Sequence, residues 1–145
     1  MKTKFLGQAG LLVETKTCKL ICDPWFSRTG GFLARWHQFP PNEHIDKHIL
    51  HDADYLYVSH EHHDHCDREF LETFPKEIPV ILANFQTKDF RDYFTELGFS
   101  KIIELDDWQK IKLSDDFEVM MITDPGKYKE DSSIFIKAED HKILN

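Results

Sequence analysis

The sequence lacks any run of basic residues, and this absence limits the partners that its surface can bind. Eighteen lysines and arginines are scattered among 26 aspartates and glutamates, which gives a net charge of -8 with histidine neutral. Proteins that bind a nucleic-acid backbone or an anionic membrane surface normally present clustered basic side chains. We therefore expect no nucleic-acid partner and no membrane partner. A small anionic substrate stays compatible with the acidic balance, because bound metal ions can supply local positive charge.

Long apolar stretches and a cysteine framework are also missing. No segment approaches the length of a membrane-spanning helix, and the first residues, Met1–Gln8, lack the apolar core of a signal peptide. The three cysteines are an odd number without a scaffold pattern. They indicate free thiols in a reducing compartment. We therefore expect a cytoplasmic protein.

What the chain does contain is a globular composition with many aromatic residues. Its 145 residues suit one domain over 1–145. The order of the expected elements, strands followed by alternating strands and helices and then strands, predicts sheets with helices packed outside them. The expected strands are Thr3–Leu6, Leu11–Thr15, Lys19–Cys22, Ala53–Ser59, Pro79–Ala83, Lys101–Leu105, Gln109–Leu113, Phe117–Thr123, Ser133–Ala138 and one that begins at Lys142. The expected helices are Asn42–His51, Arg68–Phe74, capped by Cys66 or Asp67, and Thr87–Leu97.

A cluster of metal-binding residue types directly follows the expected strand Ala53–Ser59. His60, His62, Asp64 and His65 form the pattern His-x-His-x-Asp-His. Histidines two apart on an extended loop can share one ion, and the turn after them lets Asp64 and His65 face a second ion. Imidazole and carboxylate suit zinc, and also iron or manganese. The alternative, a solvated histidine-rich turn, explains neither the spacing nor the place at the carboxyl end of a strand, where α/β sheets build their sites.

An aromatic loop precedes this cluster. Residues 25–41 contain two glycines, two prolines and several large aromatic side chains. Long loops inside compact domains tend to be functional. We expect Trp25, Phe26 and Trp36 to form a wall of a substrate pocket. The alternative is a flap that covers one edge of the core.

The histidine cluster resembles the motif of the metallo-β-lactamase superfamily. The segments Gly7–Glu14 and Leu20–Trp25 are similar to one branch of it, which includes L-ascorbate-6-phosphate lactonase-like and N-acylphosphatidylethanolamine phospholipase D-like hydrolases. Asp23–Phe26, the aromatic loop and the ending His141–Asn145 resemble more closely the β-lactamase-like part of CMP-N-acetylneuraminate hydroxylase and its bacterial relatives. The resemblance implies an α/β fold, the αββα sandwich of the metallo-β-lactamases.

The resemblance also implies roles for individual residues. His60 and His62 would hold a first metal, and Asp64 and His65 a second, with zinc as the expected ion. A bridging hydroxide would attack the substrate, and Asp64 would be catalytic as both metal ligand and orienter of that nucleophile. Asp23 would have a structural or supporting role.

These roles define a metal-dependent hydrolase that cleaves an ester, phosphodiester, lactone or amide in a small molecule. Two alternatives stay open. One is an iron-dependent or Rieske-linked oxygenase module, and the other is a degenerate, non-catalytic metal-binding domain.

Two departures from the family pattern stand out. Family members supply a third histidine to the first metal, whereas this chain has Asp124 at the corresponding strand end. Asp124 is either a replacement ligand or a residue of the turn that Asp124-Pro125-Gly126 predicts; Asp131 is a weaker candidate. The chain also stops at Asn145, before the family's later ligands. We therefore expect only the N-terminal part of the sandwich, with possible self-association through the incomplete sheet.

Overall fold

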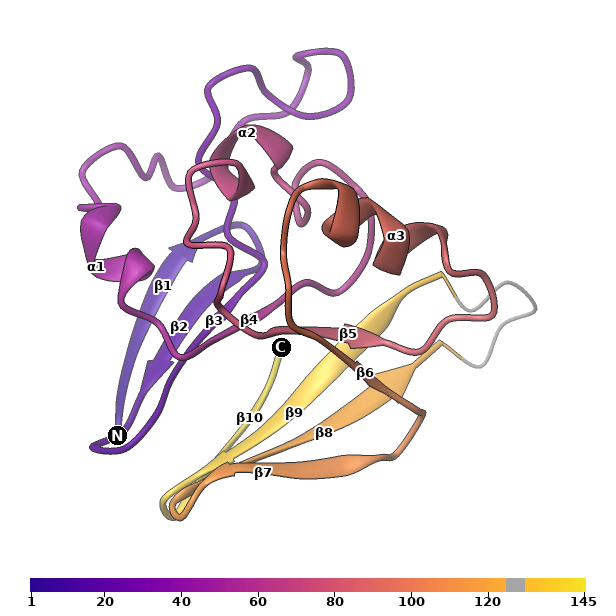
Figure 1. Ribbon diagram of the computed structural model, residues 1–145. Coiled ribbons are helices and arrows are strands. Elements are labelled where there is room, and N and C mark those ends of the chain that lie inside the picture. The colour runs from indigo at the N-terminus through magenta and orange to yellow at the C-terminus, as the bar shows by residue number, and fades with distance from the viewer. Residues whose placement is uncertain (125–129) are drawn as a thin grey trace.

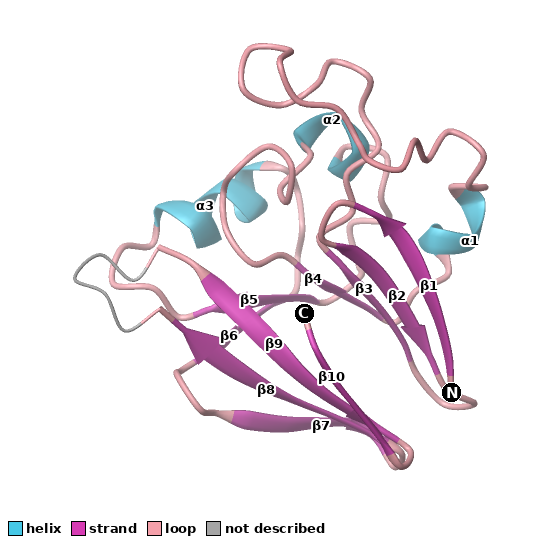
Figure 2. Ribbon diagram, turned by 180° about the vertical axis from the view of Figure 1, so that it is seen from behind, coloured by secondary structure: helices cyan, strands magenta, loops and turns pink. Residues whose placement is uncertain are grey.

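The computed structural model describes residues 1–124 and 130–145. In these residues two β-sheets face each other, and the helices lie over the outer face of the first sheet (Figure 1). The view from behind shows the same arrangement, with α1, α2 and α3 on one side of the molecule and β7–β10 on the other (Figure 2).

The first sheet has the strand order β1-β2-β3-β4-β5-β6. β1, β2 and β3 pair antiparallel, and β3, β4, β5 and β6 pair parallel. The bounds are β1 Lys2–Gly7, β2 Gly10–Glu14, β3 Lys19–Cys22, β4 Tyr55–Tyr57, β5 Val80–Ala83 and β6 Ile102–Leu105. The second sheet is antiparallel, in the order β10-β9-β8-β7. Its bounds are β7 Lys110–Ser114, β8 Phe117–Thr123, β9 Ser132–Ala138 and β10 His141–Leu144.

The central strands are apolar on both sides because both faces of the first sheet are covered. Successive side chains of a strand point to opposite faces. In β5, Val80 and Leu82 pack toward the helices, whereas Ile81 and Ala83 pack toward the second sheet. A strand buried on both faces shows a continuous apolar run rather than an alternating one. β8 has the alternating pattern instead, because only one of its faces is fully buried.

The helices are shorter than the sequence predicts. α3, Asp89–Glu96, lies within the expected helix and buries Phe90 and Phe94. α2 is limited to Arg68–Leu71, and the predicted cap is confirmed at Asp67, whose carboxylate accepts the N–H of Phe70. Pro75 disfavours helical backbone at Phe74, the last residue of the expected helix.

The prediction of a helix over Asn42–His51 is wrong for most of its length. Only α1, His48–His51, is helical. The Asn42 side chain donates to the carbonyls of Leu6 and Trp25, 2.7 and 2.8 Å away, and so ties the segment to β1 and the aromatic loop. The Asp46 carboxylate accepts the N–H of His48. Such side-chain bonds compete with the helical pattern of the backbone.

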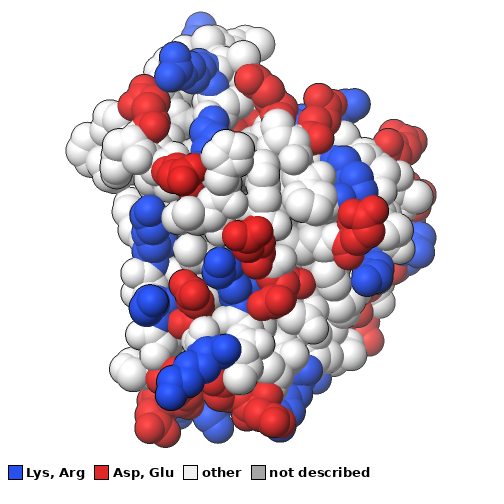
Figure 3. Space-filling model, turned by 60° about the vertical axis from the view of Figure 1, so that its left-hand side comes forward, with Lys and Arg blue, Asp and Glu red and all other residues white. Residues whose placement is uncertain are grey.

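The surface is mixed in charge. On the face shown in Figure 3, acidic and basic side chains alternate and are separated by uncharged areas. In the described part of the chain, no helix has the length and apolar character needed to cross a membrane.

Candidate metal centre

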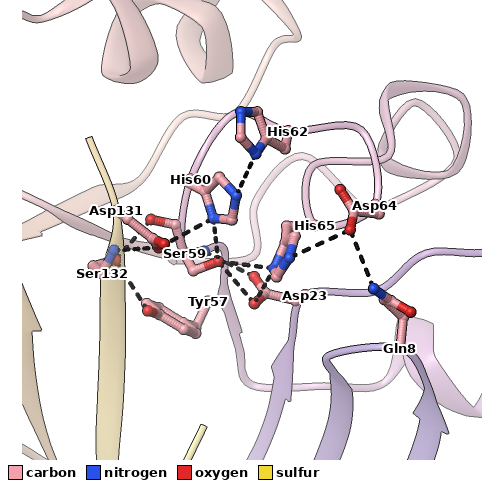
Figure 4. A network of polar contacts seen from close by, with 10 residues as sticks. All are labelled: Gln8, Asp23, Tyr57, Ser59, His60, His62, Asp64, His65, Asp131 and Ser132. Carbon is pink, nitrogen blue, oxygen red and sulfur yellow. Dashed lines mark hydrogen bonds and ion pairs between the residues drawn. The ribbon is translucent and has the colours of Figure 1, made fainter. Parts of the chain in front are cut away.

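The histidine loop begins where β4 ends. Tyr57 of β4 pairs with Cys22 of the parallel strand β3, so the residues after each strand emerge at the same edge of the sheet. A turn then folds the loop back, because the N–H groups of His65 and Cys66 both donate to the carbonyl of His62, 2.9 and 2.7 Å away. The motif residues and Asp23 therefore gather at one end of the sheet (Figure 4).

His60 and His62, the first pair, face each other through ring nitrogens. Nε2 of His60 lies 2.9 Å from Nδ1 of His62, and His60 is 8% exposed. Two nitrogen ligands of one tetrahedral zinc ion lie roughly 3.3–3.4 Å apart, given bonds of about 2.0–2.1 Å. A small movement of the rings would therefore bring both nitrogens to one ion.

Asp64 and His65, the second pair, lie beside the first. Oδ2 of Asp64 is 3.6 Å from Nε2 of His65 and accepts a hydrogen bond of 3.3 Å from the Gln8 side chain. Oδ1 of Asp64 is buried without a hydrogen-bond partner; in the described parts of the chain the only other such side-chain atom is Nε1 of Trp25. A buried carboxylate oxygen without a donor is energetically unfavourable unless a cation neutralises it.

The residues present therefore fit a divalent metal. The donor set is two histidines and then an aspartate with a histidine, types that zinc, iron and manganese all accept. Among the described residues, no three His, Cys, Asp or Glu side chains lie close enough together to bind one ion. In the first pair the two facing ring nitrogens hydrogen-bond to each other.

A second layer of polar groups fixes His65. The carboxylate of Asp23, 2% exposed, lies 2.9 Å from Nδ1 of His65 and also accepts the N–H and O–H of Ser59, each at 2.8 Å. Burial lowers the pKa of His65, but the hydrogen bond and charge of Asp23, with the charge of Asp64, outweigh it and raise the pKa. The structure thus supports the predicted supporting role of Asp23.

His60 has a different environment. Its Nδ1 lies 3.0 Å from the Ser59 hydroxyl and 3.2 Å from the Asp131 carboxylate. Burial, together with the nearby imidazole of His65, lowers the pKa of His60. This direction of the pKa shift favours the neutral form of His60, the form in which an imidazole nitrogen can bind a metal.

Asp124 and Asp131 close the outer end of the hairpin formed by β8 and β9. The N–H of Asp124 donates to the carbonyl of Asp131, 3.1 Å away, and Asp124 is exposed. The carboxylate of Asp131 lies 3.2 Å from Nδ1 of His60. A ligand role for Asp124 stays a prediction, and the turn proposed after it, 125–128, lies outside the described residues.

The aromatic loop divides into a buried and an exposed part. Trp25 and Phe26 are 1% and 3% exposed, so both rings belong to the core rather than to an open pocket wall. Trp36 is 52% exposed and packs on Phe32, whose ring lies 5.8 Å from that of His62. Of the three residues expected to contact substrate, Trp36 alone has substantial exposed surface beside the site.

Sequence reasoning missed Gln8, Ser59 and Ser132. The Gln8 side chain contacts Asp64. The Ser59 hydroxyl lies within hydrogen-bond distance of Nδ1 of His60 and of Nδ1 of His65. The Ser132 hydroxyl donates to the carbonyl of Ser59. The position of Ser59 directly before the motif was an available signal. Nothing in the local sequence indicates that Ser132, 73 positions away, meets it.

Comparison with known proteins agrees with this geometry. Residues 2–142 match the family described as the beta-lactamase superfamily domain. The fold is that of a metallo-β-lactamase-type domain, and the chain belongs to this superfamily.

Relatives of the chain point to a branch of the superfamily. A Mycobacterium tuberculosis protein provisionally named a Rieske 2Fe-2S iron-sulfur protein is 37% identical over 126 residues, which are 84% of this chain and 24% of that protein. The cytidine monophosphate-N-acetylneuraminic acid hydroxylase of Danio rerio is 28% identical over 152 residues, which cover 97% of this chain and 24% of the hydroxylase. The chain thus spans about a quarter of the length of these relatives.

Solved structures share the fold at lower identity. The isothiocyanate hydrolase from Delia radicum gut bacteria superposes with a TM-score of 0.72 at 17% identity, over 99% of this chain and 61% of the hydrolase. The FEZ-1 metallo-β-lactamase from Legionella gormanii superposes with a TM-score of 0.58 at 13% identity, over 98% of this chain and 58% of the enzyme. The chain therefore aligns with about 60% of a complete metallo-β-lactamase fold.

Proposed function

We propose that the first and second pairs bind divalent metal, and that the metal serves an oxygen-dependent reaction of a larger Rieske-type iron–sulfur protein. The observation that carries the metal site is the buried Oδ1 of Asp64, which lacks a hydrogen-bond donor among the described residues. When bound, the metal would supply Lewis acidity and, if it is iron, redox chemistry.

The surrounding residues prepare the site for that ion. Ser59 and Asp23 occupy the Nδ1 atoms of His60 and His65, which leaves the Nε2 atoms for the metal. Phe32 and Trp36 provide an apolar surface next to His62 that a small-molecule substrate can contact. The preference for oxygen chemistry rests on the 37% identity to a protein that carries a Rieske name, because the likeness to hydrolases is one of fold alone.

A second candidate is the metal-dependent hydrolase. Its support is the division of the donors into two pairs, which suits two ions that together activate water and stabilise a developing oxyanion. Zinc or manganese would favour this candidate, and iron would favour oxygen chemistry. In both cases we place the protein in the cytoplasm, since its three cysteines are unpaired.

Elemental analysis tests the metal site. We expect near-stoichiometric metal in the wild-type protein and its loss in the double variant His60→Ala/His62→Ala. The matched control is His44→Ala/His141→Ala, which removes two exposed histidines and should keep the metal. Equal metal contents in all three proteins would contradict the proposal.

Activity assays then separate the candidates. The iron-loaded protein should consume oxygen when ascorbate is the reductant, and His60→Ala/His62→Ala should not. Cleavage of p-nitrophenyl esters or phosphodiesters by the zinc-loaded protein, without oxygen consumption by the iron form, would instead establish the hydrolase. Metal binding without either activity would favour a non-catalytic metal-binding domain.

A further inference from the structure

The second sheet contacts the histidine loop through the start of β9. The Ser132 hydroxyl donates to the carbonyl of Ser59, 2.7 Å away, and lies 3.0 Å from the hydroxyl of Tyr57 (Figure 4). A serine has only one hydroxyl proton, so Tyr57 must be the donor to Ser132. Burial, together with the charge of Asp23, raises the pKa of Tyr57, in agreement with this donor role. Ser132 is 7% exposed and Tyr57 is fully buried, so water does not compete for these bonds.

Asp131 adds a second contact from the same strand end. Its Oδ1 accepts the N–H of Ser132 at 2.7 Å and lies 3.2 Å from Nδ1 of His60. Its carbonyl accepts the N–H of Asp124. The carboxylate is therefore anchored by the backbone beside it, although its side chain is 63% exposed.

Donor and acceptor roles around His60 determine where its proton lies. The Ser59 hydroxyl donates to Asp23, so toward His60 its oxygen can only accept. An ionised Asp131 can also only accept. Both acceptors are next to Nδ1 of His60, so Nδ1 carries the proton and Nε2 presents its lone pair toward His62.

We propose that Asp131 and Ser132 are positioning residues through which the second sheet sets the tautomer and orientation of His60. This inference rests on the proposed metal site. Asp131 acts from the Nδ1 side of the ring, opposite the nitrogen that faces His62, so it supports a ligand rather than serving as one. Outer partners of metal-binding histidines have this function, since they hold the ring and fix its proton.

Two measurements on the same variants test the proposal. The variants are Asp131→Ala, Ser132→Ala and the conservative Asp131→Asn, which keeps an acceptor oxygen near Nδ1 of His60. The control is Asp140→Ala, an exposed carboxylate in the turn at the other end of β9. The first readout is the ¹⁵N chemical shifts of the His60 ring in metal-free protein, which separate the two tautomers. The second is zinc affinity, measured by competition with a chelator.

We expect wild-type protein and Asp140→Ala to show the Nδ1–H tautomer and equal affinity. Asp131→Ala and Ser132→Ala should show a mixture of tautomers and an affinity lower by on the order of 10- to 100-fold, with unchanged zinc stoichiometry at saturation. Asp131→Asn should lie closer to wild type. Far-ultraviolet circular dichroism verifies that each variant is folded.

The outcomes distinguish this proposal from the proposed function. Unchanged tautomer and unchanged affinity in folded Asp131→Ala and Ser132→Ala would overturn the positioning role and leave the metal site intact. A lower stoichiometry in Asp131→Ala would also overturn it, because Asp131 would then be a ligand. If wild-type protein binds no zinc but the tautomer changes in the variants, the positioning role stands and the proposed metal function fails.

Discussion

Asp23 and His65 are 42 positions apart in the sequence, yet a carboxylate oxygen of Asp23 lies 2.9 Å from Nδ1 of His65. Asp23 reaches this place with a left-handed backbone, φ 42°, directly after β3. Aspartate and asparagine tolerate this conformation better than most residues. The backbone turn thus aims the carboxylate at the histidine loop, and the parallel pairing of β3 with β4 sets the two segments side by side.

Replacing Asp23 by asparagine should weaken metal binding more than it weakens the fold. The amide retains the backbone conformation, but its nitrogen cannot accept the hydrogen bonds of Ser59 and His65. We expect metal affinity to fall on the order of 10- to 100-fold. Competition with a chelator measures the metal affinity. The control is Asp54→Asn, because the Asp54 carboxylate accepts the N–H of Lys19 at the far end of β3. An equal loss in both variants would show that the effect is not specific to His65.

Asp64→Asn should separate stability from metal binding. In the metal-free protein Oδ1 of Asp64 is buried without a donor, so removing the charge should leave the free energy of unfolding unchanged or raise it by about 1 kcal/mol. Wild-type protein should gain about 2.7 kcal/mol when the metal concentration is one hundred times its dissociation constant. The variant should lose most of this gain. Urea unfolding with and without metal measures both quantities, and a strongly destabilised metal-free variant would contradict this account of Asp64.

The grouping of the four motif residues could be predicted from the sequence because its information is local. His60, His62, Asp64 and His65 lie within six residues, and their spacing alone groups them at a strand end. The strands with long apolar runs, such as β5, were also predictable, since burial on both faces leaves a clear pattern. The family and the sandwich fold follow from the same local signals, and the comparisons confirm them.

What the sequence could not provide are contacts made between distant segments. Ser132 and Asp131 meet the histidine loop because the start of β9 lies beside the end of β4. Trp25 was expected beside substrate, but the fold buries it, and its position within a predicted loop gave no sign of that. Loop residues are assigned to a core or to a pocket by tertiary packing, which local composition does not report.

Asp67 should be the most important anchor of the aromatic loop. Its fully buried carboxylate accepts the N–H groups of Phe26, Ser27 and Phe70, at 2.7, 2.6 and 3.2 Å. Asp67→Ala would leave these donors unsatisfied, so we expect a loss of about 2–4 kcal/mol in the free energy of unfolding. Asp46→Ala removes an exposed carboxylate that accepts one N–H, and it should cost about 1 kcal/mol or less. Urea unfolding compares the two, and similar losses would argue against the anchoring role.

The thiol of Cys18 should make the fold sensitive to alkaline pH. Cys18 is 3% exposed, and burial, with the charges of Asp54 and Asp116, raises its pKa to about 12. In the unfolded chain a thiol titrates near about 8.5, so above that pH the native state holds a proton that the unfolded state has released. The free energy of unfolding must therefore fall as the pH rises from about 8.5 toward the native pKa.

Cys18→Ala removes this contribution, and its stability should fall less steeply over the same range. Val13→Ala is the matched control, because Val13 lies in the same buried cluster and cannot ionise. Both variants should be less stable than wild type at pH 7.5, since each leaves a cavity. Only Cys18→Ala should have the shallower pH dependence in urea unfolding between pH 8.5 and about 10.5. If Val13→Ala and Cys18→Ala lose stability in parallel as the pH rises, the buried thiol is not the group responsible.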